Sequence, residues 1–167
     1  GILNGMTTPV RVSIDDFLAM EETKPYLELI DGEVVEKAMP NPSHSSIVVI
    51  LIRRLANYLD ESKEARVDTE MRHLQNEEQR VYLPDVSVTL NSRFPKGMRR
   101  GLVETHPDFA IEVLSPDDRA ARVLDRVQFY LRAGVRLVWL VHTALRVVFG
   151  HRPGILGEGD RRPDTTT

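Results

Sequence analysis

The sequence contains no cysteine among its 167 residues. A disulfide framework and thiolate ligands for zinc are therefore both excluded. Any metal site must be built mainly from oxygen, which favours magnesium or manganese over zinc. The histidines do not change this conclusion, because they are scattered without metal-ligand spacing: His44, His73, His106, His142 and His151.

An excess of positive charge and long apolar runs are also missing. The formal net charge of −3 argues against a protein that coats nucleic acid by bulk electrostatics. It leaves room for a local basic groove, because salt confines the field of a charge to about 10 Å. No stretch approaches the roughly 20 apolar residues of a membrane-spanning helix, and no signal peptide is visible. We therefore expect a soluble, cytoplasmic protein.

The length of the chain suits one domain with a hydrophobic core of its own. We expect residues 6–152 to form this domain, with Met6 as the natural start and residues 1–5 as an expression remnant. Residues 157–167 have almost no apolar side chain. We therefore expect the tail at 153–167 to be disordered.

The first part of the chain carries clear boundary signals. Ser13 is a good N-cap for a short helix over 14–22, which ends before Pro25. Residues 26–38 predict a β-hairpin, because Asp31-Gly32 suits a tight primed turn.

The rest of the pattern alternates helices and strands. Its order predicts an α+β (mixed α/β) fold with a central mixed β-sheet flanked by helices. The expected elements are a helix from a Ser43 cap to about Asp60, an antiparallel pair at 65–74 and 80–90, a basic loop at 91–101, a strand at 108–114, a helix at 118–133 that stops at Gly134, and strands at 135–141 and 145–150.

Two acidic residues, Asp85 and Glu112, each lie inside a short apolar run of β type. A carboxylate buried without compensation costs several kcal/mol, so two of them on neighbouring strands point to a divalent-metal site. Glu28, also flanked by apolar residues, would supply a third carboxylate. Such a site suits phosphodiester hydrolysis, because metal ions neutralise phosphate charge and lower the pKa of a bound water. The alternative is that each acid simply faces solvent, and Pro84 is compatible with such a strand margin.

Four segments together resemble the Uma-type putative restriction endonuclease family, which belongs to the PD-(D/E)XK nuclease superfamily. The resemblance runs from about Tyr26 to Gly150 and implies a restriction-endonuclease-like core. It rests on these segments, in family order: Glu28-Leu29-Ile30-Asp31-Gly32-Glu33, Pro84-Asp85-Val86, Ile111-Glu112-Val113-Leu114-Ser115-Pro116 and Tyr130-Leu131-Arg132-Ala133-Gly134-Val135.

The resemblance implies roles for individual residues. Asp85 matches the aspartate of the superfamily's Pro-Asp motif and Glu112 its second acid, so both would bind the metal. Glu28 matches the acid before the hairpin turn. The family's lysine is typically displaced to the following helix, four residues before the tyrosine matched by Tyr130. Arg126 occupies that position here.

Arginine is not an equal replacement for lysine. It stays charged and grips phosphate in a planar fork, whereas lysine can shift its pKa and contact a water closely. Arg126 could therefore stabilise charge on phosphate without taking part in proton transfer, which is worth roughly 10²–10⁴-fold in rate. The alternative is that Arg126 merely pairs with Asp125, Asp117 or another surface acid.

Five further residues are candidates for contact with nucleic acid. The segment around His44 resembles the family's helix with its early histidine, and the favoured alternative for this residue is local bonding at the helix start. The basic loop could grip DNA phosphates or simply be solvated. Its basic residues are Arg93, Lys96, Arg99 and Arg100.

The leading hypothesis is a Mg2+- or Mn2+-dependent endonuclease that hydrolyses DNA phosphodiester bonds. A homodimer is expected, since two symmetric sites cut two strands most simply. The alternative, motivated by Arg126, is a catalytically inactive nuclease-fold protein that binds nucleic acid or a protein partner. An oligomerising structural module without a ligand is a third possibility.

Overall fold

The structure is a computed structural model, and it describes residues 10–96 and 101–154. The expected expression remnant at 1–5 lies outside the described residues, as does the tail from residue 155 onward. Arg99 and Arg100 of the basic loop also lie outside them.

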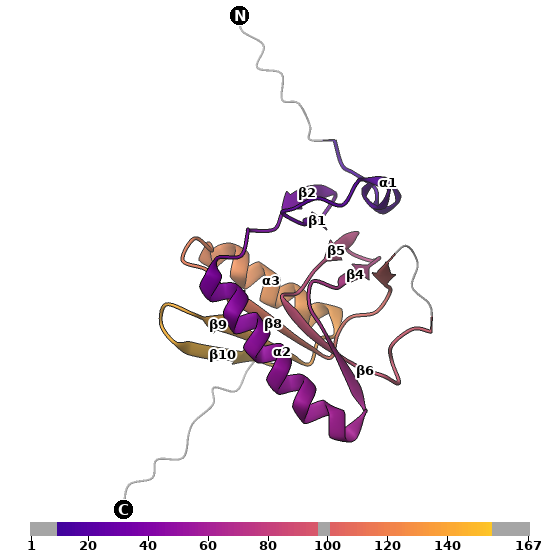
Figure 1. The fold of residues 1–167 in the computed structure, drawn as a ribbon. Coiled ribbons are helices and arrows are strands. Elements are labelled where there is room, and N and C mark those ends of the chain that lie inside the picture. Colours follow the sequence, from indigo (N-terminus) through magenta and orange to yellow (C-terminus); the bar gives the residue numbers. More distant parts are fainter. Residues whose placement is uncertain (1–9, 97–100, 155–167) are drawn as a thin grey trace, which may run out of the picture.

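Three helices and ten short strands make up the described chain (Figure 1). In chain order they are α1 (Ile14–Ala19), β1 (Leu27–Ile30), β2 (Glu33–Glu36), α2 (Pro42–Ser62), β3 (Ala65–Asp68), β4 (Arg72–Gln75), β5 (Arg80–Tyr82), β6 (Val86–Leu90), β7 (Leu102–Val103), β8 (Phe109–Leu114), α3 (Ala120–Ala133), β9 (Leu137–His142) and β10 (Val147–His151).

The strands form two mixed five-stranded sheets, whereas the sequence predicted one central sheet. The first sheet has the order β2-β1-β5-β4-β7, and the second has the order β10-β9-β8-β6-β3. Each sheet contains one parallel pair, β4 with β7 and β8 with β9. The mixed α+β architecture predicted from the sequence is confirmed, with the strands divided between two sheets.

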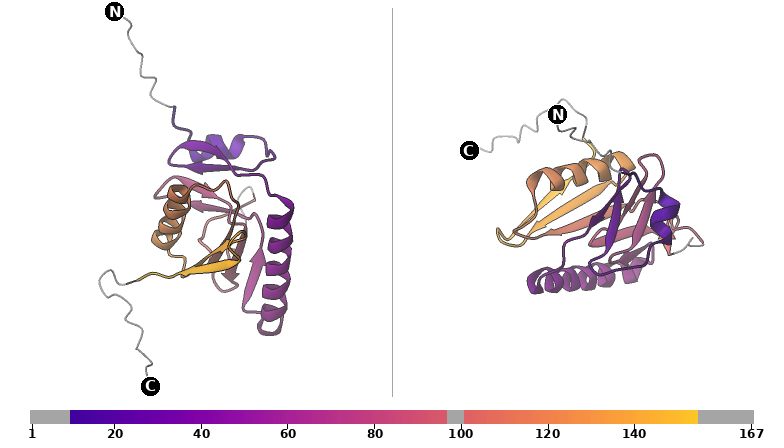
Figure 2. Two further views of the ribbon diagram at one scale, coloured as in Figure 1. Left: turned by 90° about the vertical axis from the view of Figure 1, so that its left-hand side faces the viewer. Right: turned by 90° about the horizontal axis from the view of Figure 1, so that it is seen from above.

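Helices α2 and α3 cover opposite faces of the second sheet (Figure 2). Alternation along β8 explains this arrangement, because successive strand side chains point to opposite faces. Ile111 and Val113 pack with apolar residues of α2. Ala110 packs with the buried face of α3. By the same alternation Glu112 points toward α3, and this register decides where the carboxylate lies.

The β1–β2 hairpin forms one edge of the first sheet, and α1 packs against it. Phe17 of α1 is buried against Leu29 of the hairpin and Val81 of β5. Asp31 and Gly32 both have positive φ, 49° and 80°, so the predicted primed turn is confirmed. Ser13 accepts a hydrogen bond from the Asp16 N–H, as its N-cap assignment requires.

Several boundaries differ from the sequence prediction. Helix α1 ends at Ala19, not at residue 22, and α3 begins at Ala120, not at residue 118. Asn41, not Ser43, caps α2, because the Asn41 side chain accepts from the His44 N–H while Pro42 takes the first helical position. The expected antiparallel pair is present but broken, since β4 pairs with β5 in one sheet and β3 pairs with β6 in the other. Pro84 lies at the break, where its missing N–H cannot continue a ladder.

No helix within residues 10–96 and 101–154 combines the length and apolar composition that a membrane span requires.

Candidate active site

The break between β5 and β6 places Asp85 beside Glu112. Asp85 precedes β6, and β6 pairs antiparallel with β8, which carries Glu112. The Val113 N–H donates to Asp85 Oδ2 at 2.7 Å, which fixes the aspartate against the strand of the second acid. Thr69 holds the break from the other side, because its hydroxyl donates to the Asp85 carbonyl at 2.8 Å. One hydrogen bond to the carboxylate and one to the main-chain carbonyl therefore position Asp85.

The three predicted acids are buried, so the solvent-facing alternative is wrong. Glu28, Asp85 and Glu112 are 2%, 3% and 6% exposed. All three line one pocket. Glu28 enters it from the hairpin, and its Oε1 accepts from the Leu83 N–H at 2.8 Å. The three acids therefore share one pocket, and their role as metal ligands stays a prediction.

Arg126 of α3 links two of these acids. Its Nε donates to Glu112 Oε1 at 2.8 Å, and its two terminal nitrogens contact both oxygens of Glu28. The Tyr130 hydroxyl also donates to Glu112 Oε1. The alternative in which Arg126 pairs with a surface acid is therefore wrong. Arg126 bridges the buried carboxylates in a fork that lysine could not reproduce.

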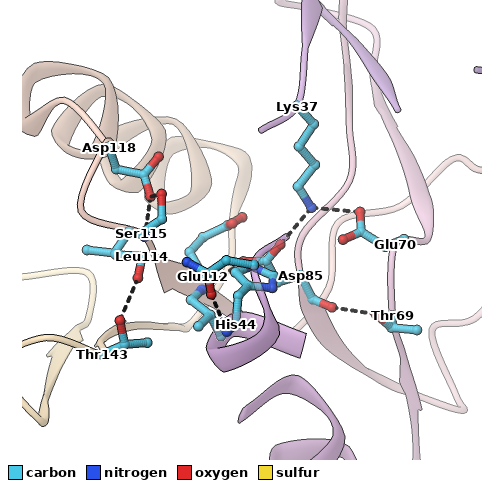
Figure 3. Close-up of polar contacts among 12 residues, drawn as sticks. Lys37, His44, Thr69, Glu70, Asp85, Glu112, Leu114, Ser115, Asp118 and Thr143 are labelled. Atoms are coloured by element: carbon cyan, nitrogen blue, oxygen red, sulfur yellow. Dashed lines mark hydrogen bonds and ion pairs between the residues drawn. The ribbon is translucent and has the colours of Figure 1, made fainter. Parts of the chain in front are cut away.

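Lys37, which follows β2, enters the same site, and the sequence analysis missed it. Its ammonium lies 2.8 Å from Asp85 Oδ1 and donates to Glu70 Oε2 and to the Leu83 carbonyl, both at 2.7 Å (Figure 3). Glu70 was missed as well. Neither residue lies in a recognisable motif, and only the hairpin and the turn between β3 and β4 bring them together.

His44 also reaches the site from the first turn of α2. Its Nε2 lies 3.2 Å from Asp85 Oδ2 (Figure 3). The hydrogen bond to Asp85 raises the pKa of His44 above its ordinary value. The family-like early histidine is therefore a neighbour of the candidate metal ligand, and its predicted contact with nucleic acid stays a prediction.

The two central carboxylates have opposite electrostatic environments. Burial raises the pKa of Glu112 to about 7, and the negative charge of Asp85 adds to this effect against the opposing charge of Arg126. Burial also opposes ionisation of Asp85, but Lys37 and His44 together outweigh burial and hold the pKa of that carboxyl well below its usual range. Such a divergent pair of acids in one pocket is typical of functional sites.

The ammonium of Lys37 is held in its charged form. Burial disfavours the charge, but Asp85, Glu112 and Glu70 outweigh burial and raise the pKa of Lys37 above its ordinary value. Lys37 therefore stays an ion in this structure and cannot act as a general base.

The pocket has a volume of about 270 Å³ and opens between the hairpin and the start of α3. Two exposed arginines, Arg119 and Arg122, line it along the first turn of α3. The Ser115 N–H donates to Asp118 Oδ2 at 2.7 Å and orders the turn that leads into this helix (Figure 3). The same rim carries the exposed carboxylates of Glu36, Asp117 and Asp118, so its charge is mixed, and the two arginines are its groups that can receive a phosphate.

The two described basic residues of the predicted basic loop, Arg93 and Lys96, do not line this pocket. Arg93 donates to Asp108 Oδ1 at 2.6 Å and also contacts Thr105 and His106, so its guanidinium is tied to the protein. Lys96 is exposed. The proposed contact of these two residues with phosphate stays a prediction.

The donor chemistry of the pocket fits a hard divalent cation. Its three buried carboxylates, Glu28, Asp85 and Glu112, exceed its two partly buried cations, and carboxylate oxygens are the donors that hard divalent ions take. However, in the described part of the chain, no three acidic or histidine side chains converge as they would around a bound metal. The ammonium of Lys37 and the guanidinium of Arg126 take up several of the carboxylate oxygens instead.

Comparison with known families identifies the family of this chain. The profile of the Uma2 family, described as a putative restriction endonuclease, matches residues 14–166. The chain belongs to this family. Families with this endonuclease fold generally use a divalent metal. No match is found among curated proteins.

A solved structure supports the same conclusion about the Uma2 fold. The chain is similar to a putative nuclease of the DUF820 group from Anabaena variabilis, with 30% identity and a TM-score of 0.77. The likeness covers 85% of this chain and 80% of that one. The restriction-endonuclease-like core predicted from the sequence motifs is therefore confirmed.

Proposed function

We propose that this Uma2 protein is a divalent-metal-dependent endonuclease that hydrolyses phosphodiester bonds in DNA. The proposal is carried by one observation: Asp85, just before β6, and Glu112 of β8 share a pocket, and the N–H of Val113, the neighbour of Glu112, donates to Asp85. The pocket offers oxygen donors and no thiolate, which favours Mg2+ or Mn2+.

Asp85 and Glu112 would hold the metal, which neutralises phosphate charge and activates a water when bound. Arg126 supplies a permanent positive charge beside Glu112 and stabilises the charge that develops on the phosphate. Glu28 positions Arg126, because its carboxylate receives both terminal nitrogens of the guanidinium. In this proposal Asp85 and Glu112 are the metal ligands, Arg126 is the cation that stabilises charge, and Glu28 orients Arg126.

Two arginines at the pocket rim support a polyanionic substrate, beside the exposed carboxylates of Glu36, Asp117 and Asp118. Arg119 and Arg122 are exposed at this rim, where each can contact a phosphate. Each phosphate contact adds to salt-sensitive affinity, with a slope of about −0.9 per contact in duplex DNA. Arg122→Gln should therefore weaken DNA binding and reduce the salt slope by about one. The same change should not weaken metal binding, because Arg122 contacts none of the candidate ligands.

A homodimer is part of the proposal, because two symmetric sites place one pocket on each DNA strand. Light scattering of the purified protein with and without duplex DNA tests whether it is a dimer. A monomer under both conditions would contradict the proposed homodimer. A cytoplasmic location stays a prediction from the sequence.

Cleavage of supercoiled plasmid with Mg2+ or Mn2+ tests the activity. We expect the wild type to nick and linearise the plasmid and Glu112→Gln to be at least 100-fold slower. Asp60→Asn removes an exposed carboxylate remote from the pocket and serves as the matched control with wild-type rate. Chelation of the metal should abolish cleavage. Wild-type cleavage that survives both chelation and Glu112→Gln would contradict the proposal.

A specific observation supports the alternative of an inactive relative that binds nucleic acid or a protein partner. Arg126 is locked between Glu28 and Glu112, and Arg126 stands where a lysine is expected. Arg126→Lys separates the two cases in the same plasmid assay. Cleavage that appears only with lysine would favour the inactive alternative, whereas wild-type cleavage lost in Glu112→Gln would exclude it.

A further inference from the structure

Three oxygens surround the ammonium of Lys37 at nearly equal distances. Glu70 Oε2 and the Leu83 carbonyl lie 2.7 Å from Nζ, and Asp85 Oδ1 lies at 2.8 Å. An ammonium has three hydrogens to donate, so this cage satisfies all of them. Figure 3 shows Lys37 reaching down from the hairpin to the carboxylates of Asp85 and Glu70.

The cage has the chemistry of a cation site. Two carboxylates and a main-chain carbonyl are the donors that hard divalent ions take in proteins. The Lys37 side chain is only 11% exposed, so its charge is enclosed together with these oxygens. The Lys37 ammonium is a point charge that occupies the position that a metal ion would take. It neutralises the carboxylates that a metal ion would otherwise neutralise.

We propose that Lys37 is a resident cation that competes with the divalent metal for Asp85, so that metal enters only when the lysine is displaced. This inference rests on the proposed metal-dependent function and adds a control on it. The site then carries its own counter-ion, which keeps the buried aspartate compensated while no metal is bound.

The structure provides a place for the displaced side chain. A second cavity of about 340 Å³ adjoins the first, and Lys37 lines both. Glu70 lines the second cavity but not the first. Lys37 can therefore release Asp85 and remain paired with Glu70, so that its charge is never left without a partner.

Metal affinity measured by calorimetry with Mn2+ tests the inference. In Lys37→Gln the amide keeps two donors for the cage oxygens but removes the charge. We expect Lys37→Gln to bind Mn2+ at least about tenfold more tightly than wild type. Lys24→Gln is the matched control, because Lys24 is exposed at the second cavity and loses the same charge. It should bind Mn2+ like the wild type.

The outcomes separate the two proposals. Tighter binding in Lys37→Gln alone supports the inference. Equal, measurable binding in wild type and Lys37→Gln overturns the inference but leaves the proposed function standing. No binding in either protein overturns the proposed metal-dependent function and the inference with it. If Lys24→Gln increased the Mn2+ affinity by the same factor, the effect would come from the loss of any nearby positive charge, and the inference would be overturned.

A measurement on the wild type covers the case in which Lys37→Gln does not fold. The side-chain ammonium of Lys37 is enclosed and hydrogen-bonded, so its NMR signal should be protected from solvent exchange. Addition of Mg2+ should shift this signal or remove its protection. A protected signal that Mg2+ leaves unchanged would overturn the inference.

Discussion

Glu112 carries a carboxyl group whose ionisation its surroundings oppose, and replacing it with glutamine should stabilise the protein in a pH-dependent way. Burial raises its pKa from 4.5 to about 7. The folded state therefore holds this proton more tightly than the unfolded chain, and stability falls as pH rises from about 4.5 to about 7. At 1.36 kcal/mol for each pH unit, the ionised form lowers the free energy of unfolding by about 3 kcal/mol above that window.

Glutamine resembles the protonated carboxyl group and cannot ionise. Its amide oxygen can still accept from Arg126 and from the Tyr130 hydroxyl, which are the contacts of Glu112 Oε1. Glu112→Gln should therefore match the wild type near pH 4.5 and exceed its free energy of unfolding by about 3 kcal/mol near pH 8.5.

Urea denaturation at a series of pH values measures this difference directly. The subtraction of wild type from variant removes the contributions of other titrating groups that the substitution leaves unchanged. Glu33→Gln, at an exposed position of the hairpin, controls for the change of residue type. A stability difference for Glu112→Gln that does not change with pH, or one that reverses sign at high pH, would refute the reasoning.

Three further predictions address the site and the fold that positions it. Arg126→Met leaves two buried carboxylates without their shared cation and should lower the free energy of unfolding at neutral pH by about 3–5 kcal/mol in urea melts; a loss below 1 kcal/mol would contradict the ion-pair account. NMR titration should give His44 a pKa above 6.5 that falls in Asp85→Asn, because the hydrogen bond to Asp85 is its first cause; its stabilising effect is complete below pH 6.5 and is lost as pH rises through the folded-state pKa. Gly134→Ala should destabilise by more than about 1 kcal/mol, because Gly134 has φ 103° and an added Cβ would lie 2.7 Å from His106 Nε2; unchanged thermal stability would be inconsistent with this packing.

Local signals in the sequence predicted those parts of the fold that depend on neighbouring residues. Asp31-Gly32 specified the hairpin because both positions need positive φ. Gly134 ended α3 in the left-handed conformation for the same reason. The break at Asp85 was harder to predict, since Pro84 indicated a strand margin but not that the two halves would join different sheets.

The candidate site likewise contains some residues that local patterns predict and others that depend on how distant segments pack. Asp85 and Glu112 lie in short apolar runs, so their burial and convergence followed from pattern and resemblance. Lys37 follows the hairpin in a segment without periodicity, and Glu70 lies in a turn with a φ of 51°. Their meeting depends on how the hairpin packs across the break between β5 and β6. No local pattern encodes that packing, so the resident ammonium could not be predicted.

A crystal structure of the protein soaked with manganese, with anomalous scattering used to locate the ion, tests the central claim most directly. The account predicts one ion bound jointly by Asp85 and Glu112, with the Lys37 ammonium moved away from Asp85. Manganese absent from the pocket in both the wild type and Lys37→Gln, or bound only at sites that involve neither acid, would contradict it.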